Sequence, residues 1–580
     1  MHNRKRTVLF SLLINGIIAL LFIRAEVWNF HDGLIHEIIY GGAVFILCAV
    51  IPLLVYCTKW AAGIYEAVLD WMLSLKNHWK KIAVWTGAVL VSIPAGILCS
   101  LVLSGIFHLE HNRMLVLICA SLILCIIAIC LLWKQAKQYP EKIFLSLCLT
   151  AGSFFILAAP AEVGICWDDN FHYDGTIAAV TVNGAYYASD AEIIDHVADV
   201  ALEKKFYDEK SREERTELIN GLYEKRELMP YSHANLGLYS ITYLPHAVGI
   251  VIGRGLSLPY TWTFRLEKLI NLLFYSLTIY FAIKKLRFGK ILMAAVGLLP
   301  TNLFMVSSFS YDPWITALLM LGFAYFFAVM QDENHVITNG EMAVMLGSFF
   351  FGCLPKAVYF VLMFPLLFIP KNRFENEKKR RWWIFLVFLT AFALASSFIL
   401  PRLISGAGTG DTRGGKDVNP GEQIRFILNN PLGYADILFR FDLGYLNPLN
   451  AFQYMVNYAY LGFGCNRWIC TLVLAVLMFT DKAGIQSKTK LIIFAFVIAM
   501  IGVIVLVPTA LYVTYTPVGA DTVAGCQFRY LIPVVFAGLY MNSFDKIRNP
   551  LNSTLYAVLP QVMMTAVFIA DMGISLYQYF

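Results

Sequence analysis

The sequence carries little charge for its length. Only 14% of its 580 residues are Asp, Glu, Lys or Arg, whereas 59% are hydrophobic, and soluble domains carry about 25% charged residues. This composition excludes an ordinary soluble protein and predicts an all-α polytopic membrane protein within a lipid bilayer. The net charge of +6 does not indicate a nucleic-acid partner, because the basic residues lie in short loops between apolar runs.

The motifs of several soluble enzyme classes are missing as well. The sequence has no GxxxxGK[ST] phosphate loop, no HExxH and no GxSxG, and its 12 cysteines include no CxxC pair. The missing phosphate loop argues against an ATP-driven pump. Most apolar runs have no charge at their centre, which argues against a secondary transporter, because transporters use ionisable residues within their spans.

Long apolar runs are what the sequence does contain. Roughly 13–15 transmembrane helices are expected, because a run of about 20 apolar residues crosses a bilayer. The runs lie at 7–24, 33–57, 82–106, 114–133, 143–161, 267–283, 290–308, 312–330, 341–354, 356–370, 383–401, 466–480, 490–512, 529–542 and 555–575. The short pair on either side of Leu354-Pro355-Lys356 could instead form a re-entrant hairpin. We treat residues 1–142 as N-terminal accessory helices and 143–580 as the main transmembrane module.

Lys and Arg predict the orientation of these spans. Arg4-Lys5-Arg6 places the N-terminus in the cytoplasm. Alternation then puts the following loops inside: 58–81, 134–142, 284–289, 331–340, 371–382, 481–489 and 543–554. All of them except the acidic loop 331–340 are basic. Two long segments, 162–266 and 402–465, then face outside, and the first is expected to contain interfacial helices.

The densest group of polar side chains follows the apolar run 143–161. It reads Ile165-Cys-Trp-Asp-Asp-Asn-Phe-His-Tyr-Asp-Gly175. A carboxylate of Asp168 or Asp169 could act as a general base or bind a divalent metal, Mg²⁺ or Mn²⁺, and His172 is close enough to assist. Because adjacent side chains diverge, one acid could face a site while the other anchors the loop. The alternative is that all of these acids are solvated loop residues.

Three cations depart from the positive-inside pattern. Arg265, Lys356 and Arg529 lie near the predicted outer boundary, and a cation at mid-membrane costs about 2.5–3.5 kcal/mol. Each therefore needs a protein carboxylate or a lipid phosphate as its partner, and Arg529 could hold a phosphate with two hydrogen bonds. For Arg265 the alternative is that the side chain reaches the lipid headgroups. Asp312, also at this boundary, is explained by a helix cap ahead of Pro313, although a cap can also face a site.

Taken together, these segments resemble a bacterial multi-pass membrane family catalogued as a domain of unknown function, which is similar to the GT-C type glycosyltransferases. The resemblance runs from about residue 160 onward. It is carried by Trp167–Tyr173, Tyr243–Gly249, Arg265 with Leu266 and Asn271, Leu299-Pro300 with Ser307–Asp312, Lys356, Gln423–Pro431 and Gly525–Pro533. Two positions depart from the family pattern: Asp169 stands where relatives more often have Glu, and Phe528 where they commonly have Gly.

The resemblance implies a GT-C-like bundle and a polyprenyl-phosphate-linked sugar as donor. The expected reaction moves the sugar to a cell-envelope glycan or lipid acceptor at the outer face. The implied catalytic residues are Asp168, Asp169 and His172, with Asp168 and Asp169 as the metal ligands. The implied substrate and phosphate ligands are Arg265, Asp312, Lys356, Gln527 and Arg529. The alternatives are a flippase or transporter of lipid-linked glycans, an envelope polysaccharide polymerase or ligase, and a structural partner in an envelope complex.

Overall fold

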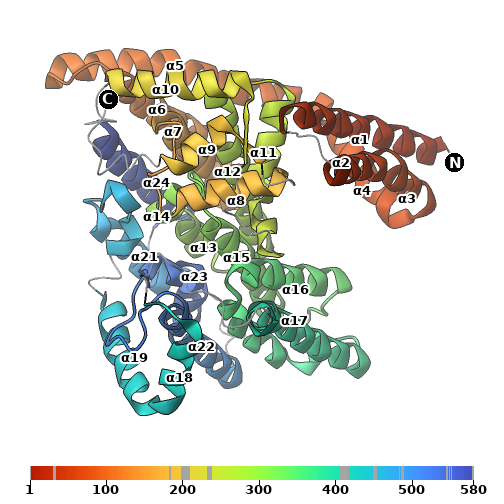
Figure 1. The fold of residues 1–580 in the computed structure, drawn as a ribbon, viewed down its shortest axis with the longest axis vertical. Coiled ribbons are helices and arrows are strands. Elements are labelled where there is room, and N and C mark those ends of the chain that lie inside the picture. The colour runs from red at the N-terminus through yellow and green to blue at the C-terminus, as the bar shows by residue number, and fades with distance from the viewer. Residues whose placement is uncertain are drawn as a thin grey trace.

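The computed structural model of the chain describes residues 2–29, 34–181, 185–196, 209–230, 238–404, 415, 417–448, 453–482, 484, 489–543, 547, 549 and 551–577. Nearly all regular structure in these residues is helical (Figure 1). One short antiparallel ribbon pairs β1 (Ala185–Tyr187) with β2 (Leu228–Pro230). The all-α prediction is therefore confirmed.

The helices follow one another along the whole chain. The first part contains α1 (His2–Asn29), α2 (Leu34–Phe45), η1 (Ile46–Val50), α3 (Ile51–Cys57), α4 (Lys59–Asn77), α5 (Trp79–Phe107), α6 (Arg113–Leu132), η2 (Trp133–Gln135) and α7 (Pro140–Ala158). The segment after α7 contains α8 (Asp169–Val180), α9 (Ala188–Asp195), α10 (Glu209–Lys225), η4 (Leu238–Tyr243) and α11 (Leu244–Gly255). The remainder contains α12 (Tyr260–Lys285), α13 (Lys290–Gly297), α14 (Pro300–Val306), α15 (Asp312–Gln331), α16 (Asn339–Cys353), η5 (Leu354–Phe368), η6 (Lys371–Arg373), α17 (Glu377–Ile404), α18 (Pro420–Asn429), α19 (Pro431–Tyr445), η8 (Tyr454–Val456), η9 (Ala459–Leu461), α21 (Arg467–Thr480), α22 (Lys490–Thr514), η11 (Phe528–Leu531), α23 (Ile532–Met541) and α24 (Ser553–Tyr577).

Nine helices in the described residues are long and apolar enough to cross a membrane, or ten if the bent pair 41–57 and 61–70 forms one span. This number is below the 13–15 spans expected, because several apolar runs are not single long helices. The run 290–308 divides into α13 and α14, since Pro300 opens a new helix and cannot continue the preceding one. The runs 466–480 and 529–542 form shorter apolar helices. The chain is nonetheless an all-α polytopic membrane protein.

The segment from Asn339 to Phe368 reverses direction at Lys356. The backbone of Lys356 is not helical (φ −134°, ψ 79°), and the N–H of Ile337 donates to the carbonyl of Arg373 at 2.8 Å. A straight helix of this length would separate its ends by about 45 Å, so these two residues could not meet. α16 and η5 therefore form a hairpin with Lys356 at its tip. Two short spans and a re-entrant pair would both give this turn, so the choice between them stays a prediction.

Several loops expected on one side of the bilayer meet at one end of the bundle. Lys285 and Glu341 form an ion pair of 2.6 Å, and the carboxylate of Asp481 accepts the N–H of Leu292 at 2.8 Å. These contacts join loops that are far apart in sequence but that alternation of spans assigns to the same side. Which side of the bilayer this end faces stays a prediction.

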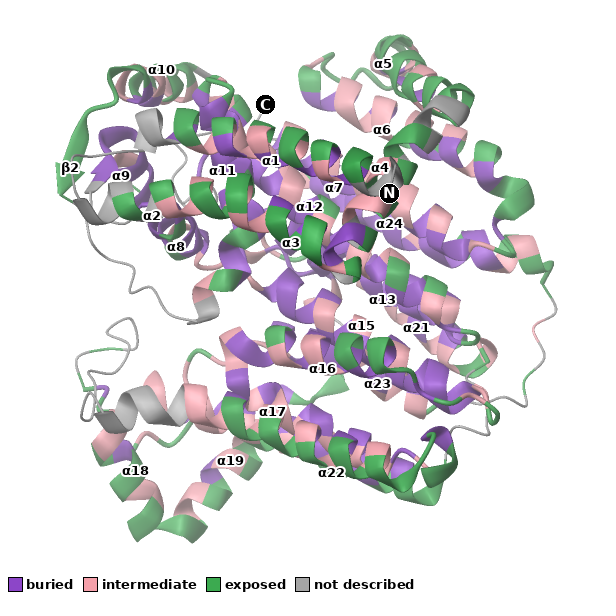
Figure 2. Cartoon of the chain, turned by 90° about the vertical axis from the view of Figure 1, so that its right-hand side faces the viewer, coloured by how far each residue is buried: buried purple, intermediate pink, exposed green. Residues whose placement is uncertain are grey.

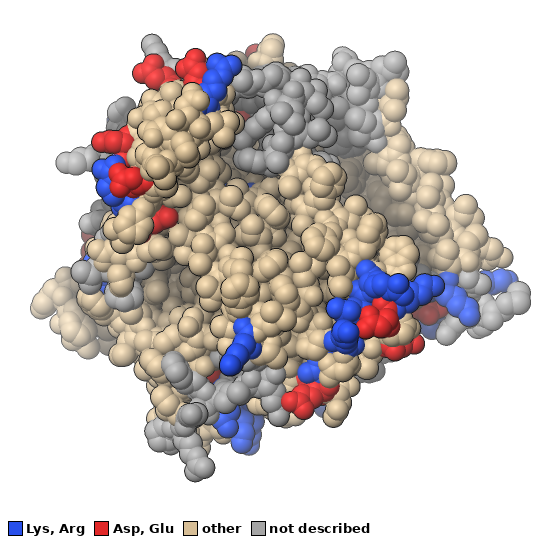
Figure 3. Space-filling model, turned by 90° about the horizontal axis from the view of Figure 1, so that it is seen from below, with Lys and Arg blue, Asp and Glu red and all other residues tan. Residues whose placement is uncertain are grey.

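The opposite end carries the short helices. In Figure 2 the long helices run across the view, while α8, α9, α10 and β2 gather toward its left-hand edge. Figure 3 shows a broad central area without Lys, Arg, Asp or Glu, with most of the charged side chains toward the edges. An uncharged area of this kind is typical of a surface that faces lipid.

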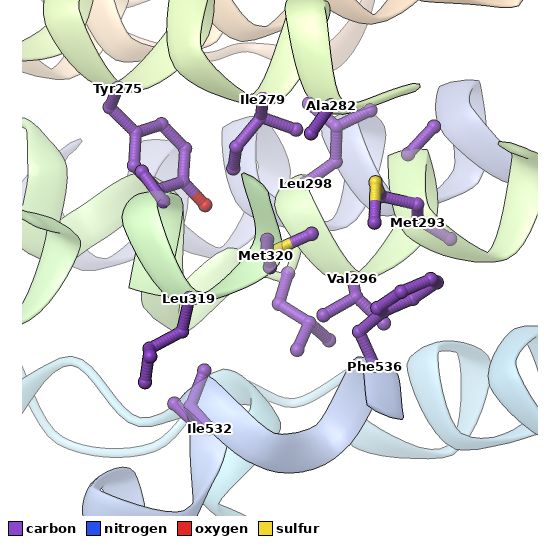
Figure 4. Close-up of a cluster of buried hydrophobic side chains, with 14 of the residues drawn as sticks. Tyr275, Ile279, Ala282, Met293, Val296, Leu298, Leu319, Met320, Ile532 and Phe536 are labelled. Atoms are coloured by element: carbon purple, nitrogen blue, oxygen red, sulfur yellow. The ribbon is translucent and has the colours of Figure 1, made fainter. Parts of the chain in front are cut away.

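The apolar core lies where α12, α13, α15 and α23 meet (Figure 4). Its buried side chains include Tyr275, Ile279, Ala282, Met293, Val296, Leu298, Leu319, Met320, Ile532 and Phe536. Helices in a bilayer associate through close packing, because lipid tails are as apolar as the side chains. Gly297 illustrates this requirement, since a Cβ there would lie 2.8 Å from the ring of Phe144.

Candidate functional site

The chain turns sharply between α7 and α8, and Asp169 holds that turn. Its carboxylate accepts the backbone N–H groups of Gly164, Ile165 and Cys166 at 2.8, 3.1 and 3.0 Å. Burial raises the pKa of Asp169 to about 6, while these three donors oppose the rise. Since both of its oxygens already accept hydrogen bonds within the loop, Asp169 is an anchor.

Asp168 faces a different direction from its neighbour. Its backbone is left-handed (φ 54°), and its side chain is 40% exposed, whereas that of Arg529, with which it pairs, is 3% exposed. Asp168 lines a cavity of about 390 Å³ between α8, α15, η5, α22 and η11, here called the Asp168 cavity. Six of the eight site residues predicted from the sequence line it: Asp168, His172, Asp312, Lys356, Gln527 and Arg529.

Two acids and two cations in this cavity form a linked group of charges. The ammonium of Lys356 is 2.6 Å from Asp312 Oδ1. Arg529 reaches both acids, with Nε 3.7 Å from Asp312 Oδ2 and Nη2 3.3 Å from Asp168 Oδ2. The capping interpretation of Asp312 is wrong, because Tyr311 occupies the cap position of α15 and the Asp312 carboxylate bonds to Lys356.

Aromatic rings lie against both cations. The guanidinium carbon of Arg529 is 4.5 Å from the centroid of the Trp167 ring, and the Lys356 ammonium is 4.0 Å from that of Tyr530 and 5.1 Å from that of Tyr311. A cation over a ring face is stabilised where water is excluded. We did not predict these rings, although each adjoins a charged site residue in the sequence.

Arg529 retains hydrogen-bonding capacity that the described residues do not use. Its side chain is buried, yet Nε and Nη1 have no hydrogen-bond partner, and neither has Oε1 of Gln527. More than nine in ten buried polar groups in proteins are paired. These two residues therefore present two N–H donors and one carbonyl acceptor to a ligand.

His172 lines the Asp168 cavity, whereas Phe528 does not. His172 Nδ1 lies 3.0 Å from the hydroxyl of Tyr243, and burial lowers the pKa of His172 to about 4, so the ring is neutral at pH 7. The ring of Phe528, the departure from the family pattern, packs on Tyr454 and Tyr445 with centroids 5.4 and 5.8 Å away. Phe528 therefore points away from the cavity and leaves it open.

Arg265 lies apart from the other predicted ligands. It lines a different cavity together with Arg113, Glu162 and Arg215, so the structure does not bring it to Lys356 and Arg529. The sequence predicts that Arg265, Lys356 and Arg529 all lie near the same end of the bundle. It does not predict which face of α12 carries Arg265.

A divalent metal does not fit the acidic pair. Asp169 is engaged by three backbone N–H groups and Asp168 by Arg529, so their oxygens do not converge on one point. Within the described ranges no three His, Cys, Asp or Glu side chains form a group that could hold a metal ion. We therefore derive no step through Mg²⁺ or Mn²⁺.

Helix composition and the charged cavity define a multi-pass α-helical membrane protein. Sequence comparison gives its family: the profile described as "Predicted membrane protein (DUF2142)" matches residues 199–537. The chain belongs to this family. No curated protein and no solved structure matches it.

The match starts later than residue 160, where the resemblance starts. It contains Asp312, Lys356, Gln527 and Arg529, whereas Asp168 and His172 precede it. The Asp168 cavity is therefore built from both the matched region and the segment before it.

Proposed function

We propose that the protein is a membrane glycosyltransferase of GT-C type, which moves a sugar from a polyprenyl-phosphate donor to an envelope glycan or lipid. One observation carries this proposal: Arg529 is buried beside Asp168, and within the described residues its Nε and Nη1 make no hydrogen bond, although Nε lies 3.7 Å from Asp312 Oδ2. A guanidinium with two N–H groups that make no hydrogen bond can donate both of them to the oxygens of a phosphate. We place the cavity at the outer face of a bacterial plasma membrane.

The walls of the cavity suit both parts of such a donor. Arg529 and Lys356 provide positive charge for the phosphate, and Gln527 Oε1 can accept a hydrogen bond from a sugar hydroxyl. Val507, Leu511 and neighbouring apolar residues of α22 line the same cavity. An isoprenoid chain would lie along this apolar wall, since it stays in the hydrocarbon region of the bilayer.

The reaction needs a base and neutralisation of the leaving group. Asp168 accepts the proton of the acceptor hydroxyl, whose oxygen forms a bond to the anomeric carbon of the sugar. The bond between that carbon and the phosphate oxygen breaks, and its electrons leave with the polyprenyl phosphate. Arg529 and Lys356 stabilise the charge that develops there. His172 is neutral, and it supports Asp168 by lining the cavity beside it.

An assay in liposomes tests this function. Purified protein is given radiolabelled polyprenyl-phosphate hexoses together with envelope lipid extract, and labelled product is measured. Asp168→Asn is expected to lower turnover by about 10²- to 10⁴-fold, as loss of a general base does, with unchanged donor affinity. Asp436→Asn is the matched control, because that acid is exposed on α19 and pairs with Arg440.

Two results would overturn the proposal. Wild-type turnover by Asp168→Asn removes the base from the mechanism. Movement of the labelled donor across the liposome membrane without product, equal in wild type and Asp168→Asn, identifies a transporter of lipid-linked glycans instead.

A further inference from the structure

The cavity that holds Arg265 contains a second concentration of arginine. It has a volume of about 800 Å³ and is lined by Arg113 of α6, Arg265 of α12 and the segment 158–162. Its buried carboxylate, Glu162, is already paired with Arg215 at 3.1 Å. The space is called the Arg113–Arg265 cavity below.

These two arginines are not matched by acids. No carboxylate of the described residues lies within ion-pair distance of either, although Glu110, Glu213, Glu217 and a further arginine, Arg212, also line the space. Arg113 donates one hydrogen bond to the carbonyl of Leu157 at 2.9 Å. Arg265 Nε is buried and has no hydrogen-bond partner in the part of the chain that the structure describes. The pair therefore has charge and donors available for an anion.

An apolar groove adjoins this cavity. It has a volume of about 750 Å³ and lies between α5, α6, α7 and α12. Its lining is mostly apolar and includes Trp85, Leu117, Leu124, Leu145, Leu149 and Tyr280. We call this space the α5–α7 groove.

Two helices lead from the cavity into the groove. On α6, Arg113 lines the cavity, and Val116, Leu117, Ala120, Ser121 and Leu124 follow at steps of three and four residues along the groove, which places them on one helix face. On α7, Leu157 lines the groove and Ala158 lines the cavity. From Lys142 to Leu157 the α7 wall is about 22 Å long, a large part of the hydrocarbon thickness.

We propose that this combined surface binds one membrane lipid with an anionic phosphate headgroup. The phosphate lies between Arg113 and Arg265, and an acyl chain occupies the α5–α7 groove. The site is separate from the Asp168 cavity, because neither the Arg113–Arg265 cavity nor the α5–α7 groove shares a lining residue with it. The proposal does not depend on the transferase function.

Native mass spectrometry of the full-length protein in mild detergent tests this site. Anionic phosphatidylglycerol and zwitterionic phosphatidylcholine are titrated separately, and the bound lipid is counted. A basic residue near an anionic lipid contributes a factor of about five in affinity, so Arg113→Gln with Arg265→Gln is expected to weaken phosphatidylglycerol binding about thirty-fold. Arg287→Gln with Arg440→Gln is the matched control, because both arginines are exposed and lie elsewhere.

The groove has its own variant and readout. Ser153→Phe fills the apolar wall without a change of charge and is expected to weaken phosphatidylglycerol binding, while inorganic phosphate alone does not displace the lipid. Thermal unfolding of each variant confirms that it is folded.

Three results would overturn the proposal. The first is that the double arginine variant binds phosphatidylglycerol as tightly as the control variant. The second is that phosphatidylglycerol and phosphatidylcholine bind equally well to the wild type. The third is that Ser153→Phe leaves phosphatidylglycerol binding unchanged.

Discussion

Arg529→Lys separates the shape of the guanidinium from its charge. Lysine keeps a cation beside Asp168 and Asp312 but lacks the planar fork that presents Nε and Nη1. Arg529→Gln is less informative, because loss of one partner of a buried ion pair destabilises a protein by about 3–5 kcal/mol. The lysine variant is therefore the one that reports on phosphate recognition.

The expected magnitude follows from Nε and Nη1, the two donors of Arg529 that make no hydrogen bond to the described residues. A hydrogen bond that involves a charged group contributes about 1.5–3 kcal/mol. Lysine can replace one of the two bonds but not both. Affinity for a polyprenyl phosphate should therefore fall roughly ten- to hundred-and-fifty-fold.

Equilibrium binding of a radiolabelled short-chain polyprenyl phosphate to purified protein measures this loss. Arg440→Lys, an exposed arginine paired with Asp436 at 2.8 Å, is the control and should bind like wild type. Equal affinity of Arg529→Lys and wild type would refute the reasoning, since the two unpartnered donors would then have no ligand.

Three further predictions concern the anchor, the buried acid and the metal. Asp169→Ala leaves three buried N–H groups without acceptors and should cost about 3 kcal/mol of stability, seen as a lower unfolding temperature that Asp436→Ala, at an exposed acid of α19, does not share. Burial raises the pKa of Glu162 from its usual 4.5 to about 7, so the ionised form is disfavoured in the folded protein and stability should fall as pH rises from about 4.5 to about 7. The glutamine of Glu162→Gln cannot titrate, so the unfolding temperature of the wild type should fall relative to that of this variant over the same pH range. A difference in unfolding temperature that stays constant with pH would contradict the raised pKa of Glu162. EDTA should leave the proposed sugar transfer unchanged, because Asp168 and Asp169 do not form a metal site. A loss of activity in EDTA that added Mg²⁺ restores would show that the reaction requires a metal ion.

Much of the helical architecture could be predicted from hydrophobic length and basic loops. Lys285, in a basic loop, pairs with Glu341, in the segment that follows an acidic loop. Alternation of spans already required those two loops to lie on the same side of the bilayer. The number of long helices could not be predicted as well, because proline decides locally whether an apolar run continues. Pro300 divides one run into two short helices.

The role of each acid in the adjacent pair depends on backbone geometry that the sequence does not display. Asp169 becomes the anchor because the turn points the N–H groups of Gly164, Ile165 and Cys166 at one carboxylate. Asp168 takes a left-handed backbone conformation and is directed into the cavity. A sequence argument could state that the two side chains diverge, but it could not say which acid would meet the loop.

The three unusual cations show how far a charge near the bilayer boundary can be interpreted. Its cost in the membrane indicates that an anionic partner exists, and this holds for Lys356 and Arg529, which meet Asp312 and Asp168. The same argument grouped Arg265 with them, although Arg265 opens onto a separate space beside Arg113. The position of a residue in an apolar run predicts its distance from the bilayer boundary. The cavity that its side chain enters depends instead on the direction of the side chain around the helix axis, which changes by about 100° per residue. The packing of α12 against its neighbours fixes that rotation.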